Sequence, residues 1–180
     1  MAGEKRAGLV AVGRTIVVMG VSGCGKTTIG RLLAGRIGVA YAEADSFHPE
    51  ANIVKMAAGQ ALGDGDRSPW LAAIAAWIAG RAGEGGVVSC SALKACYRDV
   101  LRAADPGLWF VHLVAGRDVI ARRVAGRSDH FMPASLVDSQ FEALEELGKG
   151  EAGMSVDGSG VPEQIVSVIM QRLTAGQASA

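Results

Sequence analysis

Gly20-Val21-Ser22-Gly23-Cys24-Gly25-Lys26-Thr27 fits the pattern G-x-x-x-x-G-K-[ST] at each of its fixed positions. An apolar run precedes this stretch at residues 16–19, and a helical pattern follows it. One face of that pattern is formed by Ile29, Leu32, Leu33 and Ile37. Strand, loop and helix in this order are what a phosphate-binding loop requires. The eight residues therefore predict an α/β fold that binds a nucleoside triphosphate.

The chemistry of phosphate binding explains this spacing. Glycines let the backbone curl so that successive N–H groups point at one anion, and the N-terminus of the following helix adds its dipole. Lys26 can reach the β- and γ-phosphates, and the Thr27 hydroxyl can bind Mg²⁺. The residues expected to contact ATP are Gly20, Val21, Ser22, Gly23, Cys24, Gly25, Lys26, Thr27 and Thr28.

Composition argues against several other classes of protein. The 180 residues carry 18 Lys and Arg against 18 Asp and Glu, and this balance argues against a broad basic surface for nucleic acid. The longest apolar stretches, 71–79 and 109–115, are too short to span a membrane. Residues 1–13 lack the apolar core of a signal peptide, and the three cysteines have no metal-binding spacing. We therefore expect reduced thiols and a cytoplasmic protein.

Short apolar runs alternate with helical patterns along the chain. Strands are expected at 15–19, 39–42, 87–90, 109–114 and 154–156, and helices at 26–37, 70–81, 94–104, 118–124, 134–147 and 162–173. This alternation predicts one domain with a parallel five-stranded sheet and helices on both faces. His112 is expected as a core histidine on a buried strand. Five further core residues are expected at helical spacing: Trp70, Leu71, Ile74, Trp77 and Ile78.

Two stretches do not fit the alternation. Residues 47–69 are polar and include a short helical piece at 52–58, and residues 125–133 carry Arg127 and His130. In α/β nucleotide folds, inserts at the carboxyl ends of strands are where substrate and lid lie. We therefore expect a substrate-binding insert at 47–69 and a short lid at 125–133. An N-terminal extension is expected at 1–13 and a frayed tail at 174–180.

The phosphate loop alone does not separate an ATPase, a GTPase and a small-molecule kinase. The chain has no N-K-x-D motif for reading guanine, which argues against a GTPase, and its length argues against most motor and transporter ATPases. A substrate insert directly after the second strand suits a small-molecule kinase.

Three further blocks are more specific than the loop. D-x-x-H-P begins at Asp45, D-R-x-P-W-L at Asp66 and C-S-A-L-K at Cys90, and Ser139-Gln140-Phe141-Glu142 follows later. In this order the chain resembles the gluconokinase family of phosphate-loop kinases, from about residue 16 to residue 146. The C-terminal part matches that family only loosely.

The resemblance implies transfer of phosphate from ATP to the 6-hydroxyl of D-gluconate, giving 6-phospho-D-gluconate, with Mg²⁺ as cofactor. It implies a small-molecule substrate, neither nucleic acid nor membrane as a partner, and leaves a homodimer open. Two alternatives remain: a kinase of the same fold acting on another small hydroxy acid such as shikimate, and a regulatory protein that binds ATP without turnover. The D-R-x-P-W-L and C-S-A-L-K blocks favour gluconate over shikimate. Intact Lys26, Thr27, Asp45 and Arg127 favour an enzyme.

The resemblance also assigns roles to single residues. Asp45 is expected to deprotonate the attacking hydroxyl, and its alternative role is to cap a helix that starts near Pro49. Arg123 and Arg127 should flank the lid and stabilise transition-state charge. The expected catalytic residues are Lys26, Asp45, Arg123 and Arg127. The expected substrate-binding residues are Asp45, His48, Arg67, Lys94, Arg98 and His130.

A carboxylate clamp would come from Arg67, Arg98 or Arg102, because arginine binds a carboxylate through two parallel hydrogen bonds. Arg67 stands out in an expected rigid turn between Asp66 and Pro69, with a surface ion pair to Asp64 or Asp66 as its alternative role. Arg102 is expected to be a solvated charge on a helix.

Metal binding is expected to depend on few protein ligands. No Walker B aspartate follows the third strand at 87–91, so Mg²⁺ is expected on Thr27, ATP oxygens and waters. Asp45 or Glu43 is expected behind those waters. Glu43-Ala44-Asp45 stands where the gluconokinase family usually has Asp-Gly-Asp, so the longer arm of Glu43 is a departure at the metal shell.

Overall fold

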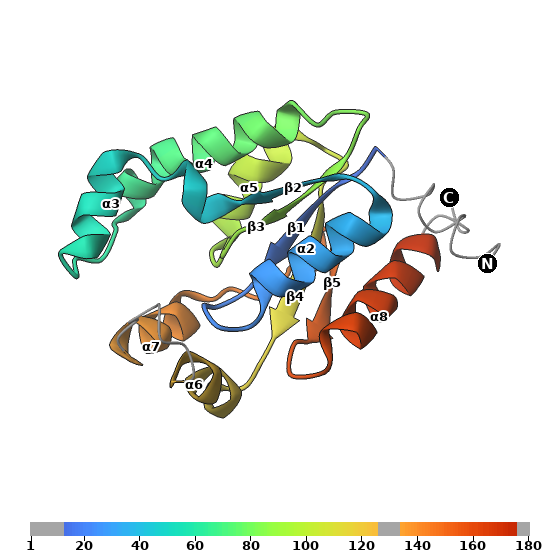
Figure 1. Ribbon diagram of the computed structural model, residues 1–180. Coiled ribbons are helices and arrows are strands. Elements are labelled where there is room, and N and C mark those ends of the chain that lie inside the picture. Colours follow the sequence, from blue (N-terminus) through green and yellow to red (C-terminus); the bar gives the residue numbers. More distant parts are fainter. Residues whose placement is uncertain (1–12, 126–133, 176–180) are drawn as a thin grey trace.

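The computed structural model describes residues 13–125 and 134–175 as a parallel sheet covered by helices (Figure 1). The elements in chain order are β1 (Thr15–Met19), α2 (Lys26–Ile37), β2 (Ala40–Glu43), the 3₁₀ helix η1 (Ala44–Phe47), α3 (Glu50–Ala57), α4 (Asp64–Ala79), β3 (Gly86–Ser89), α5 (Ala95–Ala104), β4 (Trp109–Val114), α6 (Arg117–Ala125), α7 (Ala134–Ala143), β5 (Gly153–Asp157) and α8 (Pro162–Ala175).

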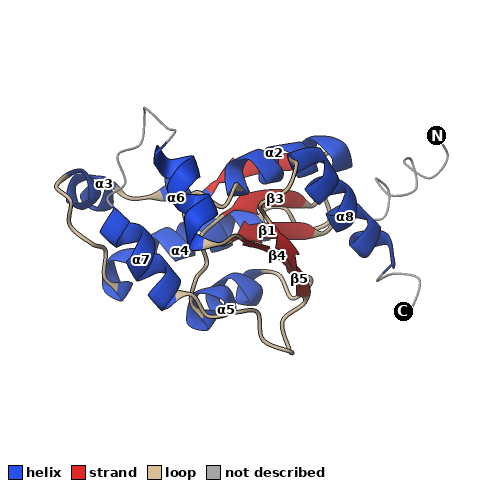
Figure 2. Ribbon diagram, turned by 90° about the horizontal axis from the view of Figure 1, so that it is seen from below, coloured by secondary structure: helices blue, strands red, loops and turns tan. Residues whose placement is uncertain are grey.

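The five strands are all parallel and lie in the order β2-β3-β1-β4-β5. The central strand β1 is completely buried. Strands β3 and β2 lie on one side of it and β4 and β5 on the other, so the direction in which the chain adds strands to the sheet reverses beside β1. In open parallel sheets such a reversal opens a crevice at the carboxyl ends of the strands, where ligands bind. Figure 2 shows α3, α6 and α7 gathered at this end of the molecule, away from the two termini.

Alternate residues of β1 face opposite sides of the sheet, as the two-residue period of a strand requires. Ile16 and Val18 pack with the buried faces of α2 and α8, whereas Val17 and Met19 pack with α4 and α5. The predicted parallel five-stranded sheet with helices on both faces is therefore confirmed (Figure 1).

Helix α4 begins at Asp64, six residues before the predicted start at 70, which is a correction to the sequence reading. Arg67 and Pro69 therefore lie inside a helix and not in a turn. Pro69 cannot donate to the carbonyl four residues earlier, a loss that usually ends a helix. The buried side chains of Trp70, Ile74 and Ile78 hold the helix against the sheet, and this packing overrides the local signal.

Other boundaries also differ from the predictions. Helix α7 ends at Ala143 and not at 147, while α8 continues to Ala175, so the predicted tail begins too early. Leu32 is 37% exposed and does not share the buried face of Ile29, Leu33 and Ile37.

His112 is buried as predicted, with the Ser155 hydroxyl 3.4 Å from its Nδ1. Over residues 13–125 and 134–175, none of the helices combines the length and apolar character needed to cross a bilayer.

Candidate active site

The phosphate loop connects β1 to α2, and β4 packs closely against its first residue. Gly20 has φ 137°, and a Cβ there would lie 2.7 Å from the Leu113 carbonyl oxygen, so no larger residue fits. Gly25 caps α2 in the left-handed conformation, with φ 109°. The Cys24 side chain is buried, as suits a small residue that packs under the loop. The motif therefore folds as its spacing predicts.

The functional side chains of the motif lie at the start of α2. The Lys26 Nζ donates to the carbonyl oxygens of Gly20 and Val21, both at 3.0 Å, so the ammonium folds back over the loop. Thr27 and Thr28 are exposed on the first turn of α2. No protein group in the described ranges hydrogen-bonds the Thr27 hydroxyl, which leaves it available to a ligand.

A residue that sequence reasoning left without a role also reaches the loop. The Ser22 backbone N–H donates to the Gln140 Oε1 of α7 at 2.6 Å, across 118 residues of chain. Gln140 lies in the Ser-Gln-Phe-Glu block that carried part of the family resemblance. That block was the only signal in the sequence that could have drawn attention to it.

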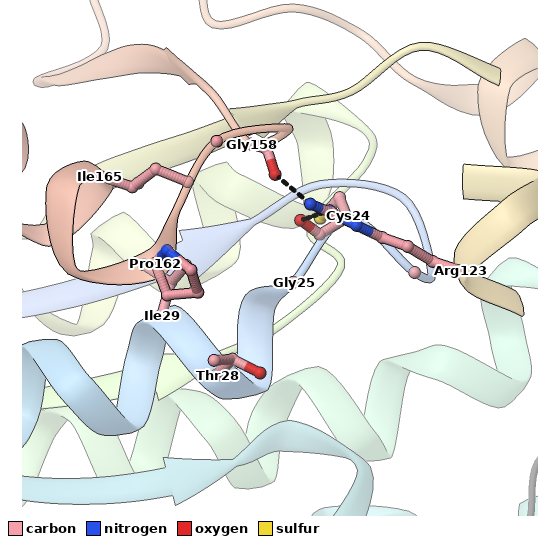
Figure 3. A pocket seen from close by; sticks show the side chains of 10 residues that line it. Cys24, Gly25, Thr28, Ile29, Arg123, Gly158, Pro162 and Ile165 are labelled. Atoms are coloured by element: carbon pink, nitrogen blue, oxygen red, sulfur yellow. Dashed lines mark hydrogen bonds between the residues drawn. The ribbon is translucent and has the colours of Figure 1, made fainter. Parts of the chain in front are cut away.

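A pocket of about 270 Å³ opens beside the loop, between the start of α2 and the turn from β5 to α8 (Figure 3). Its lining includes Gly25, Thr28, Gly158 and Pro162. Arg123 crosses from α6 into this pocket, where its Nη1 donates to the Cys24 carbonyl at 3.1 Å and its Nη2 to the Gly158 carbonyl at 2.9 Å. Arg123 thus lies against the phosphate loop.

Two carboxylates follow one another at the carboxyl end of β2. The Tyr41 hydroxyl donates to the Glu43 Oε2 at 2.7 Å, and the Ser89 hydroxyl lies 3.0 Å from Tyr41 and donates to the Lys26 carbonyl at 2.9 Å. Burial is the largest influence on Tyr41 and raises its pKa to about 12, so its hydroxyl remains a donor at neutral pH. This network connects Glu43 to the first turn of α2.

Asp45 lies in η1, directly after β2, and its side chain is exposed. Helix α3 begins after Pro49, and no side chain caps it, so the alternative role of Asp45 as a helix cap is wrong. No described residue donates a hydrogen bond to its carboxylate.

The charges of Lys26, Glu43 and Asp45 all act on the buried thiol of Cys90, the residue that follows β3. The pKa of this thiol is raised to about 12, mainly by burial. Glu43 is also the register partner of Ser89, whose hydroxyl donates to the Lys26 carbonyl, so the loop lysine and both carboxylates lie at the carboxyl ends of β2 and β3.

His48 continues this edge toward α4. Its ring stacks on Trp70 with centroids 4.7 Å apart, and the Asn52 amide nitrogen lies 3.3 Å from its Nδ1. Burial lowers the pKa of His48, while Asp45 raises it and Arg67 lowers it, so both charged groups act on the ring. His48 is therefore neutral at pH 7.

Arg67 belongs to a polar cluster that joins the starts of α4 and α5. Its Nη1 donates to the Tyr97 hydroxyl at 3.4 Å and lies 4.0 Å from the Asp64 carboxylate. The Lys94 Nζ donates to the same carboxylate at 2.9 Å, and Tyr97 donates to it as well. The pKa of Asp64 is accordingly lowered, first by Tyr97 and then by Lys94. The ion pair with Asp64, the alternative role considered for Arg67, is thus present as a long contact.

Arg98 corrects one prediction, because its guanidinium has no free donor for a substrate. The side chain is completely buried and makes a two-pronged ion pair with Glu151, at 2.7 and 2.8 Å. Its remaining N–H groups donate to the backbone carbonyls of residues 92, 93, 145 and 146. Arg102, expected as a solvated charge on a helix, is 31% exposed on α5 and pairs with Asp99 and Glu151.

The structure thus places seven of the predicted side chains on the side of the sheet where the strands have their carboxyl ends: Lys26, Thr27, Asp45, His48, Arg67, Lys94 and Arg123. It removes Arg98 from the substrate-binding set. Arg127 and His130 lie outside the described residues, as does all but the first residue of the predicted lid.

Comparison with known proteins relates this arrangement to small-molecule kinases. The family model described as shikimate kinase matches residues 22–174. The chain is 44% identical to a gluconokinase of Gluconobacter oxydans (strain 621H), over 90% of this chain and 92% of that protein. It is 42% identical to the thermoresistant gluconokinase of Escherichia coli (strain K12), over 78% and 81% of the two chains. A crystal structure of a gluconokinase from Sinorhizobium meliloti 1021 matches with a TM-score of 0.84 at 44% identity, over 91% and 93% of the chains.

Proposed function

Because the chain belongs to the gluconokinase family, we propose that it binds ATP at the phosphate loop and transfers the γ-phosphoryl group to the 6-hydroxyl of D-gluconate. The product is 6-phospho-D-gluconate. The observation that carries the assignment of the site is the contact between the ends of β2 and β3 and the phosphate loop: Glu43 pairs in register with Ser89, the Ser89 hydroxyl donates to the Lys26 carbonyl at 2.9 Å, and Asp45 follows Glu43 by two residues.

The nucleotide occupies the loop and the pocket beside it. The backbone N–H groups of the loop and the N-terminus of α2 bind the phosphates, and Lys26 leaves the loop carbonyls to neutralise charge on the β- and γ-phosphates. Arg123 already contacts the loop backbone and supplies a second positive charge at its outer side. The pocket that Arg123 lines provides room for the nucleoside.

The oxygen groups at this edge suit Mg²⁺, which prefers oxygen ligands and keeps several waters. Thr27 offers a hydroxyl with no protein partner among the described residues, and Glu43 offers a carboxylate that Tyr41 holds in place. The remaining Mg²⁺ positions are left to ATP oxygens and waters. Mg²⁺ bound there would supply charge neutralisation on the phosphates.

Gluconate lies between η1 and the starts of α4 and α5. Asp45 accepts the proton of the 6-hydroxyl as that oxygen attacks the γ-phosphorus, since its carboxylate is exposed and not engaged by the described residues. Arg67 binds the substrate carboxylate, because Arg98 has no free donor and the Lys94 Nζ donates to Asp64 at 2.9 Å, whereas Arg67 has only long contacts, 4.0 Å to Asp64 and 3.4 Å to Tyr97. Neutral His48 can donate to or accept from a substrate hydroxyl.

A kinase acting on shikimate is the second candidate, because the matching family model carries that name. A substrate panel separates the two. The purified protein is given ATP, Mg²⁺ and either gluconate, shikimate or no acceptor, and ADP release is measured. The proposal predicts ADP release with gluconate at least ten times faster than with shikimate. Faster turnover of shikimate would contradict the assignment, and no turnover with any acceptor would favour a regulatory ATP-binding protein.

The compartment proposed for this reaction is the cytoplasm. The three cysteines are all free, as expected of a reducing compartment, and ATP is the co-substrate.

A further inference from the structure

Gln140 bonds the phosphate loop from a helix distant in sequence. Its Oε1 accepts the Ser22 backbone N–H at 2.6 Å, which is short for a bond between two neutral groups. The orientation of the amide follows from chemistry, because a backbone N–H can only donate and must therefore face the side-chain oxygen. The half-buried Gln140 thus has a fixed acceptor end.

The other end of the amide has no hydrogen-bond partner among residues 13–125 and 134–175. The Nε2 group carries two N–H donors and shares a carbon with Oε1, so it also lies next to the loop. No described residue accepts a hydrogen bond from it. An unpartnered donor beside a loop that binds anions is placed to bind part of the same anion.

The position of Lys26 indicates which phosphate lies there. The Nζ of this lysine rests on the carbonyls of Gly20 and Val21, the two residues that precede Ser22. Lysine at this position of the motif reaches the β- and γ-phosphates, whereas the N–H groups nearer the helix cradle the phosphates further from the reacting end. Ser22 and Gln140 therefore lie at the γ-phosphate end of the loop.

We propose that Gln140 is a catalytic residue that anchors its Oε1 on the Ser22 N–H and donates its Nε2–H to the γ-phosphoryl group of bound ATP. This inference rests on the proposed function, because it needs ATP in the loop. A hydrogen bond to a charged group changes affinity by about ten- to a hundredfold. The contact is made with ATP and not with ADP, so the two nucleotides report on it differently.

Calorimetric binding of ADP and of a non-hydrolysable ATP analogue tests the proposal on the wild type, Gln140→Ala and Gln140→Glu. Gln140→Glu keeps an acceptor for Ser22 and replaces the donor by a negative oxygen. Gln171→Glu is the matched control, because Gln171 is exposed on α8, about 13 Å along the helix from Pro162 in the pocket.

The expected result is a ten- to hundredfold loss of affinity for the ATP analogue in Gln140→Ala, and a larger loss in Gln140→Glu. ADP affinity should stay within about threefold, and kcat with gluconate should fall in the same order of variants. Equal losses for both nucleotides, or tighter binding of the analogue by Gln140→Ala, would overturn the proposal. Tighter binding of the analogue by Gln140→Ala would mean that Gln140 only occupies the place of a phosphate oxygen.

The two proposals fail in distinguishable ways. A wild type that binds nucleotides and phosphorylates gluconate, with Gln140 variants that do not discriminate ATP from ADP, overturns the role of Gln140 alone. A wild type that binds neither nucleotide overturns the proposed function, and the role of Gln140 with it. Melting temperatures of the variants without ligand, unchanged from wild type, show that neither result comes from misfolding.

Discussion

Replacing Arg98 by alanine should destabilise the fold strongly, because this buried arginine holds three separate segments together. Its guanidinium pairs with Glu151, before β5, and donates to carbonyls at the end of β3 and after α7. The Arg98 side chain is completely buried and Glu151 is 8% exposed. Alanine would remove the two-pronged partner of a buried carboxylate and one donor from each of four carbonyls, of which that of Leu93 keeps a second donor, the Glu145 N–H.

Removing one partner of a buried ion pair costs about 3–5 kcal/mol of the free energy of unfolding. In a chain of this size each kcal/mol lowers the melting temperature by about 2–4 °C, so a fall of roughly 6–20 °C is expected. Arg102→Ala is the comparison on the same helix, because it leaves the two-pronged pair of Arg98 with Glu151 in place and removes only one longer contact to Glu151, at 3.3 Å, and an ion pair with the exposed Asp99. Its loss of stability should therefore be clearly smaller than that of Arg98→Ala.

The loss should also depend on pH. Hydrogen bonds from Arg98 are the main reason that the pKa of Glu151 is lowered from its ordinary 4.5. A lowered carboxyl pKa stabilises the fold above the ordinary value, and this stabilisation disappears as pH falls through the folded-state pKa. The difference in unfolding free energy between wild type and Arg98→Ala should therefore shrink below about pH 4.5. Urea unfolding at several pH values measures it, and a loss at pH 7 no larger than that of Arg102→Ala would refute the reasoning.

Two further predictions concern the substrate end of the site. Arg67→Ala should raise KM for gluconate by about ten- to a hundredfold, since a charge-assisted contact is worth roughly 1.5–3 kcal/mol, while KM for ATP changes little. Steady-state kinetics measure both constants, and equal changes would argue against a carboxylate contact. His48 should titrate below its ordinary pKa of 6.5, because burial disfavours its charged form, so unfolding free energy should fall as pH drops below 6.5 toward the folded-state pKa. Histidine NMR titration and melting of His48→Gln check this, and a variant with unchanged pH dependence would contradict it.

The sheet and the phosphate loop could be predicted because both are encoded locally. The loop motif combines glycines for backbone conformation with a lysine and a threonine for phosphate and metal, so its chemistry fixes its spacing. Alternating apolar runs and helical patterns then specify a parallel sheet. Asp45 and His48 could be placed because they directly follow β2 in the chain.

The errors come from contacts between distant segments. Arg98 was a reasonable clamp by its charge, but Glu151 lies 53 residues away and no local pattern relates them. The early start of α4 depends on the packing of Trp70 and Ile74 against the sheet, which outweighs the cost of Pro69. The bond from Ser22 to Gln140 likewise depends on the tertiary position of α7.

Asp45→Asn provides the most direct test of the account, because the substitution preserves shape and removes only the ability to accept a proton. Ser46→Ala is the matched control, since Ser46 is the exposed neighbour in η1 and its hydroxyl donates to the Glu43 carbonyl at 2.7 Å. The Asp45 side chain is exposed and caps no helix, so the melting temperature should not change.

The measurement is kcat with saturating ATP and gluconate for wild type, Asp45→Asn and Ser46→Ala. A positioned base contributes about 10²–10⁴ in rate, so Asp45→Asn should lower kcat by roughly 10² or more. KM for gluconate should change much less, because the amide can still hydrogen-bond the 6-hydroxyl, and Ser46→Ala should stay near wild type. An unchanged kcat in Asp45→Asn would contradict the account and make Glu43 the next carboxylate to test.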